Sequence, residues 1–209
     1  MAVTDNFSFL TIQSASEGFY KEKGSKFLGF AYPVHDEREI KASLEPLRKL
    51  YFDASHHCYA WMLGADKKYF RAFDDGEPNH SAGTPILGQI RSKELTNVLV
   101  VVVRYFGGTK LGVSGLIQAY KAAAETALAN AKIIKTEITT SFTLNFEYTA
   151  SPEIMRMVKE FDLTIENQNY EEQASILVNI NLRFKDVFLE KLKLLRATGT
   201  PITYSEKTV

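Results

Sequence analysis

Four residues that follow a long apolar run could together bind an anion. The run, 98–103, reads VLVVVV and leads into Arg104, Gly107, Gly108 and Lys110. A strand that ends here, with a helix soon after, would point backbone N–H groups and the positive end of a helix dipole at one place. The spacing fits neither the Walker A loop nor the dinucleotide fingerprint. The alternative is a tight turn in which the glycines supply positive φ and Arg104 pairs with an acidic loop.

An acidic loop with the sequence DDGEPNHSAG is a second candidate site. It places Asp74, Asp75 and Glu77 within four residues, and carboxylates this dense can hold Mg²⁺ or act as a general acid and base. The structural alternative is a turn in which the aspartates bond to nearby backbone groups. Glu77 would then pair with an arginine such as Arg71 or Arg104.

The segment ASHHCYAW contains a histidine pair and the single cysteine of the chain. On a strand His56 and Cys58 share a face, so they could form a nucleophile and base, whereas His57 points to the opposite face. A zinc site would need more ligands, and His35 and His80 are far away in the sequence. A cysteine between aromatic residues in a strand is more often a small buried apolar side chain.

A hairpin with the sequence YKEKGSKF carries basic side chains among aromatic ones. Lys23 and Lys26 flank its predicted turn, close to Phe19 and Phe27. Such a surface could grip RNA by phosphate contacts and base stacking. The alternative is a solvated hairpin whose lysines keep an edge strand from pairing with another chain.

Hydrophobic periodicity predicts the elements that position these residues. Strands are expected at 6–13, 18–34 with a turn at Gly24, 57–63, 68–74 and 98–103. Helices are expected at 37–51, capped by Asp36, at 86–93, opened by Thr84 and Pro85, and at 113–131. In the first helix Ile40, Leu44, Leu47 and Leu50 share a face, and in the third a face of small residues, Ala119, Ala122, Ala123 and Ala127, can lie close against a sheet.

The last third of the chain has the order β-α-β-β-α-β of a ferredoxin-like domain. Its strands are expected at 136–148, 163–171, 174–184 and 200–206, and its helices at 151–161 and 185–197. Inward-facing candidates in the second helix are Val187, Leu192 and Leu195. The pattern predicts two domains, 1–135 and 136–209, that pack on each other.

Composition limits the classes of function. The formal net charge is +0, so any binding to nucleic acid must come from a local basic patch. One cysteine excludes an intramolecular disulfide and fits a reducing compartment. The N-terminal segment lacks the pattern of a signal peptide, and no apolar run is long enough for a membrane span. We therefore expect a cytoplasmic protein that makes no membrane contact.

Several segments together resemble the IMPACT/YigZ family, and the bacterial YigZ-like members in particular. They are KGSKF, ASHHCYAW, DDGEP followed by AGTPIL, and VVVVRYFGGTKLG followed by GLIQAY. The block that runs from Arg104 through Gly112 matches the signature of that family. The resemblance extends over residues 15–130, and the βαββαβ tail looks like the small C-terminal domain of the bacterial members.

The resemblance implies an α+β architecture, in the form of an α/β sandwich. The first domain would have the fold of ribosomal proteins and of domain IV of elongation factor G. The second would be ferredoxin-like, similar to domain V of that factor. Eukaryotic relatives are linked to translation control through a kinase-activating partner, and they act through an additional N-terminal domain, so we do not expect that partner here.

The first hypothesis is a translation-associated regulatory protein, rather than an enzyme, that binds structured RNA or the ribosome. The residues expected to contact phosphate or to let the backbone approach it are Lys23, Lys26, Arg71, Arg104, Gly107, Gly108 and Lys110. A second hypothesis is a Mg²⁺-dependent phosphohydrolase or nucleotide-binding enzyme that uses Asp74, Asp75 and Glu77. A third is a protein-interaction module. No cofactor is expected, and the oligomeric state is left open.

Overall fold

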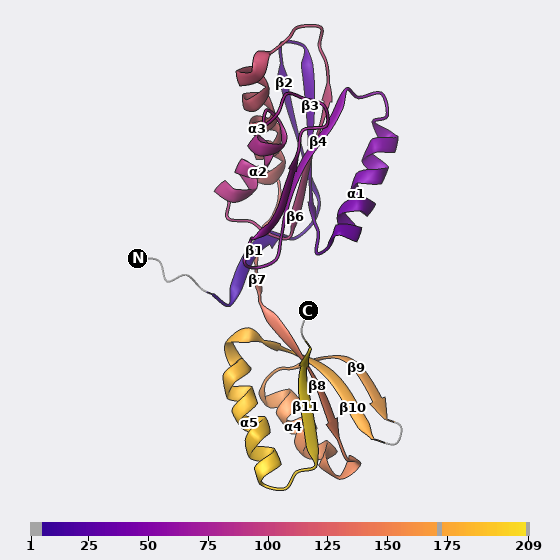
Figure 1. The fold of residues 1–209 in the computed structure, drawn as a ribbon, viewed down its shortest axis with the longest axis vertical. Helices are drawn as coiled ribbons and strands as arrows, with labels where there is room; N and C mark the ends of the chain where they lie inside the picture. The colour runs from indigo at the N-terminus through magenta and orange to yellow at the C-terminus, as the bar shows by residue number, and fades with distance from the viewer. Residues whose placement is uncertain (1–5, 171–172, 208–209) are drawn as a thin grey trace, which may run out of the picture. The chain divides into compact units, whose positions relative to one another are not determined.

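The computed structural model describes residues 6–170 and 173–207 and is an α+β fold. The chain forms two compact units, one of which is Phe9–Thr136. The other contains, among the described residues, 6–8 and 137–207 (Figure 1). The end of the predicted strand 163–171 lies outside the described residues.

The larger unit is built on a mixed succession of strands and helices. Its strands are β1 (Ser8–Ile12), β2 (Ser16–Glu22), β3 (Ser25–Pro33), β4 (His56–Leu63), β5 (Tyr69–Phe73), β6 (Val98–Tyr105) and most of β7 (Ile133–Glu137). Its helices are α1 (Glu37–Leu50), α2 (Gly83–Ser92) and α3 (Gly112–Ala129).

A five-stranded antiparallel sheet with the order β2-β3-β6-β4-β5 forms the middle layer of this unit. Figure 1 shows α2 and α3 on one face of the sheet and α1 on the other. Both faces of the central strand β6 are therefore covered, and Val98 through Val103 are fully buried, as their β-branched apolar sequence predicts. A separate two-stranded sheet pairs β1 with β7.

The helices of this unit follow from local sequence signals. Asp36 caps α1 by accepting the Glu39 N–H at 2.9 Å, which confirms the predicted cap. The small-residue face of α3 lies close against the sheet, with Ala123 fully buried. A Cβ on Gly29 of β3 would lie only 2.6 Å from the Ala123 carbonyl oxygen, so small residues on both elements permit this approach.

The smaller unit has the ferredoxin-like βαββαβ order. It consists of β8 (Thr139–Phe146), α4 (Ser151–Glu160), β9 (Thr164–Tyr170), β10 (Ala174–Asn181), α5 (Lys185–Ala197) and β11 (Ile202–Lys207). Its antiparallel sheet has the order β11-β8-β10-β9, in which the first and third strands of the unit are central. Alternate residues of β10 are buried, and the core includes Phe142 and Phe188, whose rings meet edge to face.

Four details differ from the sequence-based expectations. Helix α2 begins at Gly83, before the predicted Thr84–Pro85 start, because a carboxylate from the preceding loop caps it. The predicted strand 136–148 is divided between β7 and β8. Leu50 and Val187 are 68% and 62% exposed because each lies where its helix face turns away from the core.

No helix within the described part of the chain is both long and apolar enough to cross a membrane.

Candidate functional site

The candidate residues gather at one end of the five-stranded sheet, where β6 ends and β4 begins. In the register of these strands Arg104 lies opposite His56. The chain leaves β6 through a loop that spans 106–111 and leads into α3, and the acidic loop after β5 returns toward the same end. Sheet pairing thus brings together segments that are far apart in the sequence.

The central contact is a buried ion pair between Arg104 and Glu77. Arg104 Nη1 donates to Glu77 Oε1 at 2.5 Å, and only 6% and 8% of the two residues are exposed. The Tyr120 hydroxyl donates to the same oxygen at 2.7 Å. The Arg104 guanidinium also lies 5.7 Å from the centre of the Phe106 ring. Arg104 is therefore engaged inside the protein, and its cation is neutralised by Glu77.

The two aspartates of the acidic loop hold backbone groups. Asp74 Oδ1 accepts the Ala82 and Gly83 N–H groups at 3.0 and 2.8 Å, which caps α2, and its Oδ2 accepts the His80 N–H at 2.9 Å. Asp75 Oδ2 accepts a β4 N–H at 2.7 Å. These carboxylates shape the loop, as in the structural alternative, and of the three acidic residues it is Glu77 that contacts Arg104.

No group of three or more His, Cys, Asp or Glu side chains is placed to hold a metal ion among residues 6–170 and 173–207.

His56 and Cys58 occupy the same face of β4 but have different surroundings. His56 Nδ1 donates to the Asp75 carbonyl oxygen at 2.8 Å, and its Nε2 lies 3.8 Å from Glu77 Oε1. The Cys58 sulfur lies 3.3 Å from the Tyr120 hydroxyl, and burial raises the pKa of the thiol well above its usual value. Because the thiolate is the nucleophile and burial disfavours it, we assign Cys58 to the core and not to nucleophilic chemistry.

The β2–β3 hairpin and the loop 106–111 touch through their backbones. A Cβ on Gly107 would lie 2.0 Å from the carbonyl carbon of Gly24, so no side chain fits there. The Gly107 N–H also donates to the buried Ser25 Oγ at 3.1 Å. Gly108 has a φ of +85° and faces open space. The two adjacent glycines therefore serve different purposes, close approach at one and a left-handed backbone at the other.

The predicted cations do not all lie at this contact. Lys23 and Lys26 are exposed on the hairpin, and Lys110 is exposed on the adjoining loop. Arg71 lies on β5, at the far edge of the sheet from the hairpin, and its register partner is Trp61, well along β4 from the end at Arg104. The contact between Gly24 and Gly107 thus joins the two segments that carry these lysines, whereas Arg71 lies apart from it.

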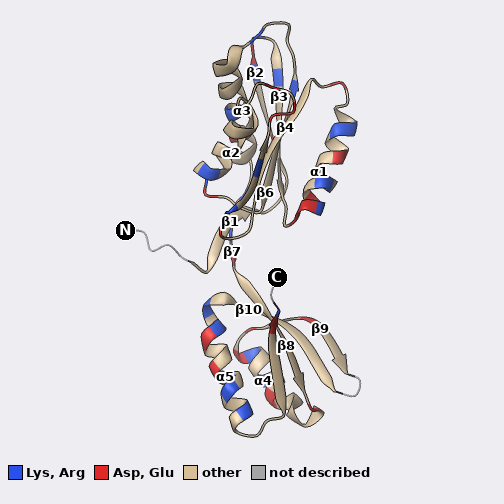
Figure 2. Cartoon of the chain, in the orientation of Figure 1, with Lys and Arg blue, Asp and Glu red and all other residues tan. Residues whose placement is uncertain are grey.

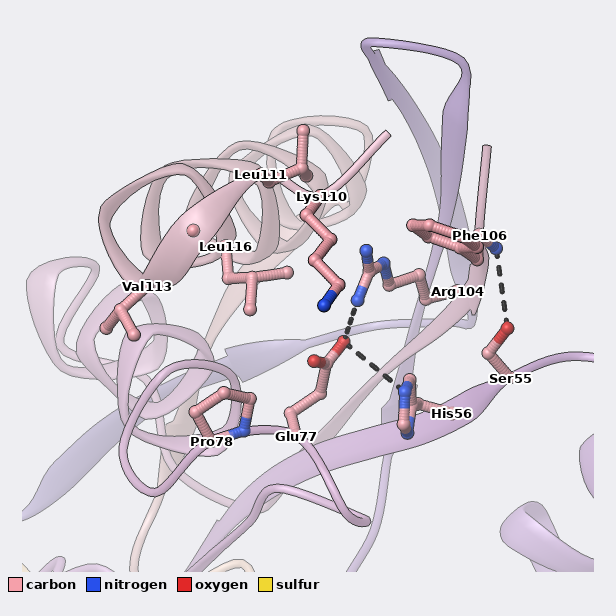
Figure 3. Close-up of a pocket in the computed structure, with 11 residues that line it drawn as sticks. Ser55, His56, Glu77, Pro78, Arg104, Phe106, Lys110, Leu111, Val113 and Leu116 are labelled. Atoms are coloured by element: carbon pink, nitrogen blue, oxygen red, sulfur yellow. Dashed lines mark hydrogen bonds and ion pairs between the residues drawn. The ribbon is translucent and has the colours of Figure 1, made fainter. Parts of the chain in front are cut away.

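A pocket with a volume of about 480 Å³ opens between the two loops and the start of α3. Its apolar walls come from Pro78, Phe106, Leu111, Val113 and Leu116, and its polar groups from Ser55, His56, Glu77, Arg104 and Lys110. Figure 3 shows these side chains converging from separate elements around the Arg104–Glu77 pair. Gly112, the first residue of α3, completes the wall.

The Impact N-terminal domain family matches residues 23–128, which is half of the chain and includes the turn of the hairpin, β3, both loops and the pocket. The chain belongs to the IMPACT family. The resemblance seen in the sequence is thereby confirmed.

IMPACT family members from bacteria match most of the chain. The YigZ member of Escherichia coli (strain K12) is 35% identical over 162 residues, which is 77% of this chain and 78% of the relative. The YvyE member of Bacillus subtilis (strain 168) is 28% identical over 207 residues, 97% of this chain and 95% of the relative. A crystal structure of a hypothetical protein matches with a TM-score of 0.76 and 28% identity, covering 97% of this chain and 98% of that one. IMPACT family membership supports a translation-associated regulatory role at the level of the family.

Some residues of this IMPACT-family site were missed by the sequence analysis. Tyr120 closes the ion pair, but a tyrosine within an apolar helix face reads as core. Ser25 ties the hairpin to the loop, although the sequence shows it only as a turn residue. The pocket wall formed by Val113 and Leu116 has no sequence signal, because it exists only where α3 passes the acidic loop.

Proposed function

We propose that this protein binds structured RNA or the ribosome through one surface of its larger unit, which we call the loop–hairpin surface. It is defined by Lys23, Lys26, Phe106, Gly107, Gly108 and Lys110. The observation that supports the proposal is the backbone contact between Gly24 and Gly107, which joins two distant segments that each carry exposed lysines. RNA phosphates are the natural ligand of such a cluster.

The start of α3 adds to this surface. Leu111, the residue before the helix, makes no capping bond through its side chain, and the first turn contains no acidic residue. The first N–H groups of a helix lack partners within it, and a helix of 18 residues has a positive N-terminal end. Lys110 precedes Leu111 at this end. The backbone N–H groups of the first turn of α3 and the Lys110 side chain therefore both favour a negative ligand.

The aromatic side chains suit RNA more than a small anion. Phe106 is 50% exposed and lines the first pocket together with Lys110. Phe19 of β2 is 51% exposed, and it lines a second pocket together with Lys26 and Phe106. Exposed aromatic rings among cations provide stacking faces for unpaired bases.

Charge is divided unequally between the two units, although the whole chain is neutral. Residues 9–136 contain 17 Lys and Arg and 13 Asp and Glu, a formal charge of +4, and the rest of the chain has 8 and 12, a charge of −4. Figure 2 shows basic residues at the β2–β3 hairpin and few charges on α3. The larger unit is therefore the better candidate for contact with RNA.

Within this proposal Arg104 is a positioning residue. Its pairing with Glu77 leaves it little charge to offer a phosphate, whereas its cation lies over the Phe106 ring and steadies the loop that carries Lys110. The phosphate contacts are thus assigned to Lys23, Lys26 and Lys110.

Co-sedimentation of the full chain with ribosomes and with a structured RNA tests the proposal. Binding at low salt should weaken as salt rises, and Lys110→Ala should weaken it several-fold, because one phosphate contact is lost. Lys121→Ala is the matched control, since Lys121 is also exposed, on α3, but lies outside the loop–hairpin surface. Absence of binding at low salt, or equal losses in both variants, would remove the proposal.

A further inference from the structure

The pocket beside the loop–hairpin surface is not needed for phosphate contact, yet it shares two of its residues. Phe106 and Lys110 belong both to the surface and to the pocket wall. An RNA strand held at the surface would therefore pass the mouth of the pocket. This continuity raises the question of which part of the RNA would enter it.

We propose that this pocket receives one unstacked nucleobase, of the kind that carries an amino group, from the RNA bound at the loop–hairpin surface. The inference rests on the proposed function and adds to it a preference for looped over fully paired RNA. A volume of about 480 Å³ has room for a base with its sugar.

The walls of the pocket suit a flat aromatic ligand. Phe106, which is half exposed, provides a ring face, while Pro78, Val113 and Leu116 provide apolar surface. Bases that leave an RNA helix are commonly bound by stacking on aromatic side chains. Fully paired RNA has no such base to offer.

One polar group of the pocket, the Glu77 carboxylate, favours a base that donates hydrogen bonds. Glu77 Oε1 already accepts from Arg104 and Tyr120. No bond to its other oxygen, Oε2, is found among the described residues, and Figure 3 shows this oxygen turned away from Arg104, on the side of Pro78. A carboxylate oxygen accepts hydrogen bonds from the amino groups of adenine, cytosine or guanine. Uracil instead has carbonyl oxygens on both sides of its one imino N–H, and these would oppose the carboxylate.

The cations of the pocket make this carboxylate compatible with RNA. Arg104 neutralises Glu77 at 2.5 Å, so the pocket does not present a bare negative charge to the strand. Lys110 at the mouth can hold the phosphate that precedes or follows the inserted base. The pocket thus combines a stacking face, an acceptor and a phosphate contact.

The test uses RNA hairpins with the same stem and loops of adenosine, cytidine or uridine, together with a duplex of equal phosphate count. Wild-type full-length protein should bind the adenosine and cytidine loops about tenfold more tightly than the duplex, since one stacked base is gained. The uridine loop should bind close to the level of the duplex.

Val113→Trp fills the mouth of the pocket from an exposed position and is therefore expected to leave the core intact. It should reduce binding of the adenosine loop to the level of the duplex, with duplex affinity and its salt dependence unchanged. Ile117→Trp is the control, one turn further along α3 and outside the pocket wall, and should behave as wild type.

The two proposals fail in different ways. If RNA binds in a salt-sensitive manner but wild type does not distinguish loops from duplex, or Val113→Trp keeps the preference, the nucleobase pocket is refuted and the surface stands. If no RNA binds at low salt, the loop–hairpin surface is refuted and the pocket with it.

Discussion

Arg104 shows how a cation that looks ready for a ligand can serve the fold instead. Its Nε is buried and has no hydrogen-bond partner among the residues that the structure describes, and its charge is balanced by Glu77. The sequence could predict that Glu77 pairs with an arginine, but it offered Arg71 and Arg104 equally. The choice depends on strand register, which places Arg104 opposite the acidic loop and Arg71 at the far edge.

We expect Glu77→Ala to lower the free energy of unfolding by about 3 kcal/mol, because it leaves a buried, unpaired guanidinium. The single tryptophan, Trp61, lies in β4 of the larger unit, so its fluorescence during urea unfolding reports on the stability of this unit. Glu45→Ala, in an exposed pair with Lys41, should change the free energy by less than about 1 kcal/mol. A similar small loss for Glu77→Ala would show that the buried pair is not structural.

His57, like Glu77, is a titratable residue whose burial affects the stability of the larger unit. It is 9% exposed, its Nε2 has no hydrogen-bond partner within the described part of the chain, and burial lowers its pKa. Below a pH of about 6.5 the unfolded chain takes up a proton that the folded His57 does not. The contribution of His57 to the free energy of unfolding is therefore constant above that pH. This free energy decreases as the pH falls from about 6.5 toward the lowered pKa of His57 in the folded protein.

His57→Leu should remove this part of the pH dependence. The measurement is the urea midpoint of Trp61 fluorescence at pH 7.5 and at pH 5, and the difference between the two should be smaller in the variant than in wild type. His35→Leu alters an exposed histidine and serves as the control. An unchanged difference in His57→Leu would contradict the assignment.

At the scale of elements, periodicity and caps were sufficient to predict most of the larger unit. The apolar run 98–103 is the central strand, Asp36 caps α1, and the alanine face of α3 meets the sheet. The start of α2 was wrong because its cap comes from Asp74, nine residues before Gly83, and local sequence windows do not include such a partner. The packing of the β2–β3 hairpin against the loop 106–111 could not be predicted from the sequence either, since it depends on how β3 and β6 pair.

The adjacent glycines of the loop give a prediction at this scale. Gly107→Ala should separate the hairpin from the loop, because its Cβ would collide with the Gly24 backbone, and RNA binding should fall several-fold. Gly108→Ala meets open space and carries only the strain of a left-handed backbone, about 1 kcal/mol. Affinity for a structured RNA, measured for both variants beside the unfolding midpoint, separates the two effects. Equal RNA affinity in Gly107→Ala and wild type would show that the contact does not organise the surface.

At the scale of the molecule, the neutral composition concealed a division of charge. The +4 of residues 9–136 becomes visible only once the boundaries of the compact units are known. The sequence could identify the family because the motif RYFGGTKLG is specific, and it could propose the three lysines as phosphate contacts, although together with Arg71 and Arg104. It could not show the pocket, whose walls come from four separate segments. The two domains, 1–135 and 136–209, and their packing on each other remain predictions.

The most direct measurement is the salt dependence of RNA affinity for wild type and for Lys23→Ala/Lys26→Ala/Lys110→Ala. If these lysines contact phosphates, the slope of log affinity against log salt should be smaller in magnitude by about 2 to 3 in the triple variant. The control Lys121→Ala/Lys132→Ala should keep the wild-type slope. Equal slopes for the triple variant and wild type would show that RNA, if bound at all, is held elsewhere.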